Sequence, residues 1–329
     1  MNAEIFAEWL RRQGHKVYRT KSSYWFNAGP GVFQAFPYHW LIAPTQAEIR
    51  NLMLGRGMIA LRYSTPLDYP GGKVSYHIVL KKPYDLATLK SQARNGVKCG
   101  MKYFKIEQIS FERLATEGWA LQRDTLKRQG RLRSMQQDGW ERLCRSADGL
   151  PGFEAWSATF KGELAAAVIA CRIGEYFYIP YALSHTSFLS HHPNNALFYS
   201  VSSELLEREG TAGIFFTVQS LDAPANVDEF KFRMGFQAIA VCQHVDFSPF
   251  LRPFTTHLVH SLIRRLYQRY PSNPALAKAE GILRFHLEGA RPVSDQTWPE
   301  CLSAQRQEAL LPSGQHTGAS RPIDLEAGR

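Results

Sequence analysis

The sequence predicts an α/β protein, and the part between about Pro151 and Ala240 predicts it most clearly. Three successive strand patterns there are followed by a helix, a strand, a short helix and a last strand. The middle strand pattern, Leu164 to Cys171, is apolar throughout, which is typical of a strand covered on both faces. A length of 329 residues leaves room for roughly two domains. We therefore expect two α/β domains and look first in the second for an active site.

Short strands alternate with helices in residues 1–110, which we expect to form the first domain. Asn2 is the expected cap of the opening helix, and Thr45 followed by Glu48 is a capping box for the next one. Asp85 is expected to cap a third helix that reaches about residue 100. The expected helices are 2–14, 45–55 and 85–100, and the expected strands are 15–27, 32–42, 58–63, 73–80 and 103–109.

Two helices, at about 111–129 and 134–147, are expected to connect the halves of the chain. The cluster Asp148-Gly149-Leu150-Pro151-Gly152 is the expected boundary after this connector. The expected division is a first domain at 1–110, a connector at 111–150, a second domain at 151–248, C-terminal helices at 249–289 and a disordered tail at 290–329. Within 151–289 we expect strands at 153–160, 163–173, 176–183, 214–218 and 237–245, and helices at 194–209, 226–234, 256–270 and 274–288.

Three short stretches of the second half resemble the acyltransferases of the GNAT superfamily: Pro193–Leu197, Glu209–Phe216 and Asp228–Phe236. They stand where that superfamily has the start of its central helix, the turn into the next strand and a closing FK-x-x-x-GF motif. In the first half, Leu89–Gly100 is similar to the last helix of a degenerate first domain. The likeness, over roughly 15–240, is to proteins with two tandem GNAT domains, including Fem-type aminoacyltransferases. It implies an α/β (α+β) fold of two GNAT-like domains, each a mixed, mostly antiparallel sheet flanked by helices.

The sequence departs from the GNAT pattern at two places. Single-domain GNAT enzymes cradle a cofactor pyrophosphate in a glycine-rich loop before the central helix, whereas the loop 184–193 of this chain has no glycine. Many GNAT enzymes also carry a tyrosine near the end of the domain that protonates a thiolate, and here Phe230 and Phe232 stand in that neighbourhood. The helical hairpin that Fem-type enzymes insert for tRNA is not evident.

Composition favours anionic partners. The formal net charge is +10, which suits nucleic acid, acidic lipid headgroups or a phosphate-bearing cofactor, and solvated surface charge is an equally good explanation. The five scattered cysteines predict reduced thiols in a cytoplasmic protein, and their spacing predicts no metal site. No apolar run approaches the ~18 residues of a membrane span.

A basic stripe is expected on one helical face, because Lys90, Arg94, Lys98 and Lys102 recur at a spacing of four. An anionic ligand or acceptor could lie against this stripe, and a solvated face is the equal alternative. Gly96 and Gly100 favour the ligand slightly, because glycines weaken a helix unless backbone must come close to something.

Histidines are the candidate proton acceptors of the loop between the third strand and the central helix. His185 or His191 could take the proton from an attacking ammonium group, whereas simple solvation of the loop, His192 included, is the favoured alternative. Asp228 is a further candidate base, with Asp222 and Glu229 beside it. Asp228 and Glu229 could instead be first-turn acids of a helix.

An activated cofactor is expected at the start of the central helix. The N–H groups at Asn194 and Asn195 suit a phosphate, with capping alone equally plausible. Tyr181 and Ala182 would line the cleft beside them, and Lys231 would add a positive charge. Tyr181 could also be an ordinary core residue.

These observations lead to one functional hypothesis and one alternative. The hypothesis is an N-acyltransferase that moves an acyl group from an activated donor, acyl-CoA or similar, to a primary amine without a metal. Strand N–H groups near Ile179 to Ala182 would stabilise the oxyanion. The alternative is a non-catalytic GNAT-fold protein that uses its basic surface to bind RNA or another polyanion.

Overall fold

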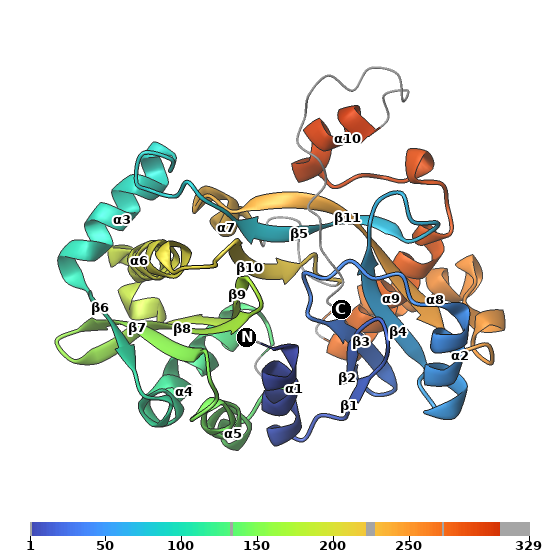
Figure 1. Ribbon diagram of the computed structural model, residues 1–329, viewed down its shortest axis with the longest axis horizontal. Helices are drawn as coiled ribbons and strands as arrows, with labels where there is room; N and C mark the ends of the chain where they lie inside the picture. Colours follow the sequence, from blue (N-terminus) through green and yellow to red (C-terminus); the bar gives the residue numbers. More distant parts are fainter. Residues whose placement is uncertain (1, 132–133, 222–227, 272, 310–329) are drawn as a thin grey trace. The chain divides into compact units, whose positions relative to one another are not determined.

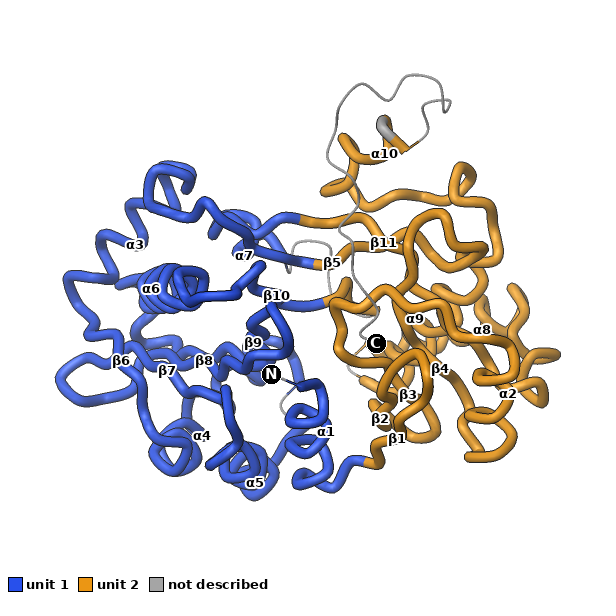
Figure 2. The backbone as a smooth tube through the Cα atoms, viewed as in Figure 1, with its two compact units in different colours: residues 1–15, 78–217, 224–237 blue, residues 16–77, 218–223, 238–329 orange. Residues whose placement is uncertain are grey.

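The chain folds into two compact α/β units, each built from stretches that are far apart in the sequence. The computed structural model describes residues 2–131, 134–221, 228–271 and 273–309. Unit 1 contains residues 1–15, 78–217 and 224–237, and unit 2 contains 16–77, 218–223 and 238–329 (Figure 2). The units differ from the domain boundaries expected from the sequence, because residues 111–150, the expected connector, lie inside unit 1.

Unit 1 has a mixed sheet in the order β10-β9-β8-β7-β6 (Figure 1). Strands β6 to β9 pair antiparallel with their neighbours, whereas β9 and β10 are parallel. Residues 164–171 of the middle strand are buried throughout, so the expectation of a strand covered on both faces is confirmed. The strands are β6 (Lys105–Ile109), β7 (Phe153–Phe160), β8 (Glu163–Ile173), β9 (Tyr176–Ser184) and β10 (Gly213–Val218).

Helices cover both faces of this sheet. One layer holds α4, which contacts β8, β9 and α5, and the other holds α6, which contacts β7, β8 and α3 (Figure 1). Trp140 of α5 is fully buried, and its indole N–H donates to the Leu114 carbonyl oxygen of α4 at 3.1 Å. The helices are α1 (Ala3–Arg12), α3 (Ser91–Tyr103), α4 (Phe111–Arg128), α5 (Gln137–Ala147), α6 (Pro193–Glu207) and α7 (Glu229–Arg233).

Unit 2 has strands in the order β1-β2-β3-β4-β11 and a core around the buried Trp25, Phe33 and Leu61. The helix α2 packs on this core because Ile49 and Leu52 share one of its faces. The strands are β1 (Val17–Arg19), β2 (Tyr24–Gly29), β3 (Val32–Phe36), β4 (Ala60–Thr65) and β11 (Gln237–Phe247), and β5 (Lys73–Leu80) has residues 73–77 in this unit. The helices are α2 (Gln46–Gly55), α8 (His257–Arg269), α9 (Pro274–Gly289) and α10 (Ser303–Ala309).

Two sequence-based expectations about elements are corrected. Asp85 does not begin the third helix: its carboxylate accepts from the N–H groups of Ala87 and Thr88 in a separate turn, and α3 begins at Ser91. In the tail that we expected to be disordered, residues 293–309 contain two short 3-10 helices and α10, while 310–329 lie outside the described residues. Within the described ranges, every helix is too short or too polar to cross a lipid bilayer.

The glycines of α3 let this helix approach α6 closely. A Cβ atom at Gly100 would lie 2.5 Å from the carbonyl oxygen of His192 and 2.8 Å from Cβ of Ala196. A Cβ atom at Gly96 would lie 2.9 Å from Nδ2 of Asn195. All three distances are shorter than normal contacts, so the backbone of α3 comes close to α6 because these residues have no side chain.

We expect Gly100→Ala to lower the free energy of unfolding by about 1–3 kcal/mol, because the new methyl group meets a backbone oxygen that cannot turn away. The matched control is Gly139→Ala in α5, where the methyl would make an ordinary 3.7 Å contact with Met135 and helix propensity should give up to about 1 kcal/mol of stability. Urea denaturation measures both. Equal stability of the two variants would show that α3 does not approach α6 in this way.

Candidate functional site

The candidate site of unit 1 lies where β9 and β10 part. The two strands pair in parallel from Gly213–Tyr176 to Phe215–Tyr178, and then β9 continues to Ser184 and β10 to Val218 without further paired positions. Backbone N–H and C=O groups that leave a ladder need other partners. The edge of β9 that faces β10 is therefore without a paired strand beyond Tyr178.

A β-bulge on the other edge of β9 marks the same position. Ile169 of β8 pairs with Tyr181 and Cys171 pairs with Tyr178, so two residues of β9, Ile179 and Pro180, stand opposite one residue of β8. Bulges of this kind redirect backbone groups next to functional sites. Pro180 has no N–H group, so the expected oxyanion donors between 179 and 182 reduce to Ile179, Tyr181 and Ala182.

Tyr181 is held by two indole rings. Its ring makes edge contacts with Trp9 at 6.3 Å and with Trp140 at 6.1 Å between centroids. Burial, with a smaller contribution from the nearby Cys144, raises the pKa of Tyr181 to about 12. The phenol is therefore protonated at neutral pH and rigid, which suits a wall residue better than a base. Ala182, the next residue, is half-buried.

The end of β9 is anchored by α4. The Thr125 hydroxyl accepts from the Ser184 N–H at 3.1 Å, and the Arg128 guanidinium donates to the Ser184 carbonyl oxygen at 2.7 Å and to its Oγ at 2.9 Å. Asp124 accepts from the N–H and the hydroxyl of Thr186, at 2.8 and 2.6 Å. Neither the motifs nor the spacing of the sequence indicated these α4 residues, because the contacts join positions about sixty residues apart.

The loop after β9 folds as a 3-10 helix, Thr186–His191, instead of an open cradle. The His185 N–H donates to the Ala165 carbonyl oxygen, and the N–H groups of Phe188 and His192 donate to carbonyl oxygens within the loop. Donors that are occupied in this way cannot hold a pyrophosphate. The loop 184–193, which has no glycine, therefore differs in local structure from the glycine-rich phosphate loop of GNAT enzymes.

His185 is oriented by Ser187. Nδ1 of His185 lies 2.6 Å from the Ser187 hydroxyl oxygen and 3.3 Å from the Ser187 backbone nitrogen. The Ser187 backbone N–H donates to Nδ1, and the Ser187 hydroxyl can donate to the same nitrogen, so the neutral ring carries its hydrogen on Nε2. His185 is half-buried, so it can exchange protons with a ligand.

Negative charge is available beside this imidazole. The pKa of Asp124 is lowered: burial alone would raise it, but the hydrogen bonds from Thr186 and the positive charges of Arg128 and His185 outweigh burial. Asp124 is therefore ionised and would stabilise an imidazolium at His185.

The other loop histidines have different surroundings. His191 packs against Tyr103 of α3 with 4.4 Å between ring centroids. His192 takes a left-handed conformation at φ 59° and precedes α6. Its side chain does not cap the helix, and Gly100 faces its carbonyl oxygen. The structure thus brings His185, but not His191, to the end of β9.

The start of α6 presents two asparagines. The Asn194 amide donates to Ser184 Oγ at 3.1 Å, and the Asn195 amide lies 3.4 Å from the sulfur of Met234. Pro193 at the first position has no N–H, so the N–H groups of Asn194 and Asn195 are the leading donors of the helix. The capping role considered from the sequence is absent, since neither side chain caps α6.

Asp228 forms an ion pair, which weakens the expectation that it is a general base. Its carboxylate, only 2% exposed, lies 2.5 Å from Nζ of Lys231, and Nζ also lies 4.5 Å from the ring centre of Phe216. Removing either charge would leave the other buried. Lys231 is thus engaged in structure as well as being a candidate cofactor contact. Asp222 lies outside the described residues.

The basic stripe lies on α3, but on the side away from α6. The helix persists to Tyr103, which places Arg94, Lys98 and Lys102 along one face as expected, and Lys90 is the residue before its first turn. Lys90, Lys98 and Lys102 are exposed, whereas Ala93, Gly96, Val97 and Gly100 are the buried side. The stripe is an exposed surface of unit 1.

A group of three or more potential metal ligands does not occur among the residues that the structure describes.

Unit 2 holds a polar cluster that the sequence interpretation missed. Arg62 donates to the Gln243 side chain and, at 2.6 Å, to the Gln219 carbonyl oxygen, while Ser75 Oγ donates to the Gln219 side chain at 2.8 Å. His77 lies 2.9 Å from Ser64 Oγ. A shallow recess beside the cluster is lined by Tyr38, Trp40, Arg62, Ser64, Val218 and Gln243 among others. The alternation of Ser75 and His77 with apolar residues in β5 is a signal of period two that could have indicated it.

No protein-family model matches this sequence, and no curated protein matches it. Among solved structures the chain is similar to FemX, with a TM-score of 0.52 and 10% identity over 75% of this chain and 92% of FemX. It is also similar to the C-terminal domain of a putative lysylphosphatidylglycerol synthetase from Agrobacterium fabrum, with a TM-score of 0.48 and 11% identity over 73% of this chain and 87% of that one. A tandem GNAT protein from the clavulanic acid biosynthesis pathway gives 0.44 and 11% over 69% and 79%. The likeness to FemX shows the fold, so the α/β fold of Fem-type proteins expected from the motifs is confirmed.

The buried histidines of unit 2 predict acid sensitivity. Burial lowers the pKa of His39 and of His77 from the ordinary 6.5 to about 3, with the charges of His39 and Arg62 adding to the effect at His77. The unfolded chain takes up protons below pH 6.5, whereas the folded chain keeps both rings neutral until about pH 3. The free energy of unfolding therefore falls as pH decreases through this window, by about 2 kcal/mol per histidine at about pH 5.

We expect His77→Gln, which can keep a hydrogen bond to Ser64, to reduce the loss of stability between about pH 7 and about pH 5 by roughly 2 kcal/mol. Urea denaturation at the two pH values measures it, with His257→Gln at an exposed position as the control. If His77→Gln and the unaltered protein lose the same stability, His77 is not buried in its neutral form.

Proposed function

We propose that this chain is an N-acyltransferase that moves an acyl group from an activated donor to a primary amine at the point where β9 and β10 part. The observation that carries the proposal is the end of strand pairing at Tyr178 and Phe215, with a bulge in β9 directly beyond it. An extended acyl chain would lie along the open edge of β9. Its carbonyl oxygen would accept from strand N–H groups at Ile179, Tyr181 or Ala182.

The chemistry needs positioning, oxyanion stabilisation and one proton acceptor. The amine attacks the donor carbonyl carbon, the tetrahedral oxyanion is stabilised by strand N–H groups, and the leaving group departs with the electron pair of its bond. The imidazole of His185 takes one proton from the attacking ammonium group and the departing group takes the second, with Ser187 orienting the ring and Asp124 stabilising the imidazolium. Asp228 keeps its ion pair throughout.

Acyl-CoA is the first donor to test, and aminoacyl esters of RNA are the second. The loop after β9 uses its N–H groups internally, so binding of a phosphate would depend on the N–H groups of Asn194 and Asn195 at the start of α6. An adenosine pyrophosphate would have few direct donors here. The protein would therefore recognise the acyl arm of the donor rather than its nucleotide.

The test is a thermal-shift panel with acetyl-CoA, longer acyl-CoAs and free CoA, followed by an amine-transfer assay. A donor present at roughly 100 times its dissociation constant should add about 2.7 kcal/mol of stability. We expect Ala182→Phe, which places a large side chain next to the proposed acyl site, to abolish this gain. The control is Ala28→Phe, at a half-buried alanine in the strand β2. Loss of the shift in both variants, or in neither, would contradict the proposed position.

A role for His185 as base has its own readout in the same assay. His185→Gln should lower the rate of transfer by about 10²–10⁴-fold without changing the thermal shift caused by the donor. His192→Gln, at an exposed position of the same loop, is the control.

The exposed basic stripe favours one alternative, a non-catalytic protein that binds RNA or another polyanion. Lys98→Gln together with Lys102→Gln should then weaken binding of single-stranded RNA and reduce the slope of log affinity against log salt by about 0.7 for each lost contact. Arg50→Gln, exposed on α2, is the control. A donor-induced thermal shift that is unaffected by these lysine changes would favour the acyltransferase.

A further inference from the structure

Large apolar side chains are concentrated on the surface of one segment of unit 2. Exposed fractions are 77% for Phe250, 82% for Leu258 and 58% for Leu262. Six side chains of this kind lie between residues 250 and 270: Phe250, Phe254, Leu258, Leu262, Leu266 and Tyr270. We call these six residues the α8 surface. Single exposed apolar residues are ordinary, but a contiguous set marks an interaction site.

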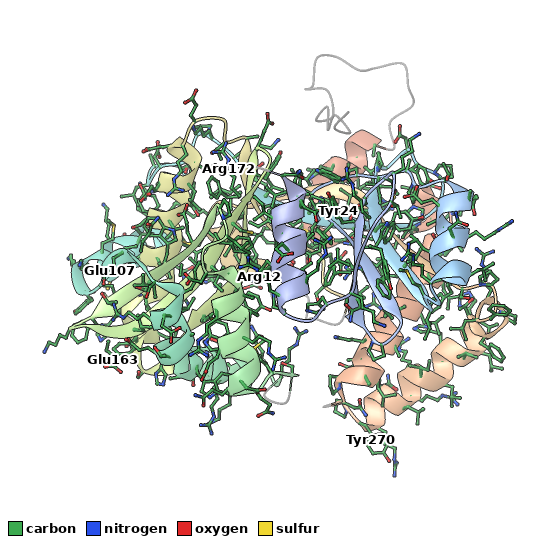
Figure 3. The ribbon with its side chains drawn as sticks, turned by 60° about the horizontal axis from the view of Figure 1, so that its bottom comes forward. Arg12, Tyr24, Glu107, Glu163, Arg172 and Tyr270 are labelled. Carbon is green, nitrogen blue, oxygen red and sulfur yellow. The ribbon has the colours of Figure 1, made fainter. Side chains whose placement is uncertain are left out.

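The leucines of α8 are not part of its packing against α9. Leu258, Leu262 and Leu266 recur every four residues and so share one face of the helix. The side that carries the partly buried Ile263 and Tyr267 packs on α9, and His260 there lies 3.1 Å from Glu280 of α9. Figure 3 shows Tyr270 at the outer edge of unit 2, where its ring points away from the ribbon. The leucine face therefore remains exposed while the opposite side of α8 packs on α9.

Positive charge surrounds this apolar face. The sequence from Phe247 to Ala279 contains four arginines and one lysine and no aspartate or glutamate. Arg252, Arg264, Arg265 and Arg269 are all exposed. By the spacing of the helix, Arg265 lies at one edge of the leucine face and Arg269 lies next to Leu258 and Leu262, within the last turn. An apolar stripe with arginines beside it is the pattern of a helix that lies in a membrane interface.

We propose that the α8 surface binds the surface of an anionic lipid bilayer. The leucines and the two phenylalanines would enter the boundary between headgroups and acyl chains, Tyr270 would lie at headgroup level, and Arg265 and Arg269 would meet lipid phosphates. The charge of this surface favours anionic lipid over a second copy of the chain as its partner. In a two-fold dimer the same arginines of both copies would lie close together and repel each other. The helix lies in the interface and does not span the bilayer. This inference is independent of the proposed function.

The experiment is co-sedimentation of the full chain with vesicles of phosphatidylcholine alone and with vesicles that contain about one third phosphatidylglycerol. The unaltered protein should bind the anionic vesicles and bind the neutral ones far more weakly. Arg265→Gln with Arg269→Gln should lower the affinity about fivefold for each arginine. Leu258→Ser with Leu262→Ser should lower it by at least tenfold on the same vesicles.

The matched controls are Leu54→Ser and Arg50→Gln, a leucine and an arginine that are also four residues apart and exposed on α2. They should leave vesicle binding unchanged, and all variants change exposed side chains and should keep the melting temperature. Failure of the unaltered chain to bind anionic vesicles would overturn the proposal, as would equal loss in the α2 controls. A dimer in solution that Leu258→Ser with Leu262→Ser makes monomeric would show that a second copy covers the face instead.

Discussion

Unit 1 depends on a parallel strand pair that hydrogen-bonds over only three positions. Each backbone donor and acceptor beyond Phe215 and Tyr178 has to be satisfied in another way, because an unpaired buried polar group costs about 1–3 kcal/mol. On the edge away from β10, the backbone groups of β9 bond to β8, with a bulge in the ladder. At its end, α4 replaces the missing neighbour: Thr125 and Arg128 bind the backbone of Ser184. One edge of β9 is left without a paired strand, and His185 follows directly after it.

Short-range features of the sequence predicted most of the elements. The apolar run of β8 and the Thr45 cap of α2 each act over a few residues, and both elements formed where these features indicated. The Asp85 helix was wrong for a local reason as well: an aspartate can cap a single turn as readily as a helix, and six residues separate the two possibilities here. Cap residues report that a turn begins, and not how long the helix is.

The site was less predictable because it is assembled from distant positions. His185 could be identified from its place in the loop. Its partner Asp124 lies on the amphipathic helix α4, where nothing in the sequence distinguishes it from the other polar residues of that helix. The ion pair of Asp228 with Lys231 could have been predicted from the sequence, because opposite charges three residues apart share a helical face. The glycines of α3 predicted a close approach of backbone, and the partner proved to be α6 rather than a ligand.

Because the two units alternate along the chain, an activity cannot be assigned to one unit by deleting a continuous stretch of sequence. Neither unit corresponds to one uninterrupted stretch of polypeptide, because unit 1 uses residues 1–15, 78–217 and 224–237 and unit 2 uses what lies between and after them. Cutting the gene at any single point removes strands from at least one core, and at most points from both. Deletion series would therefore report on folding, and dissecting this protein requires changes of single side chains in the intact chain.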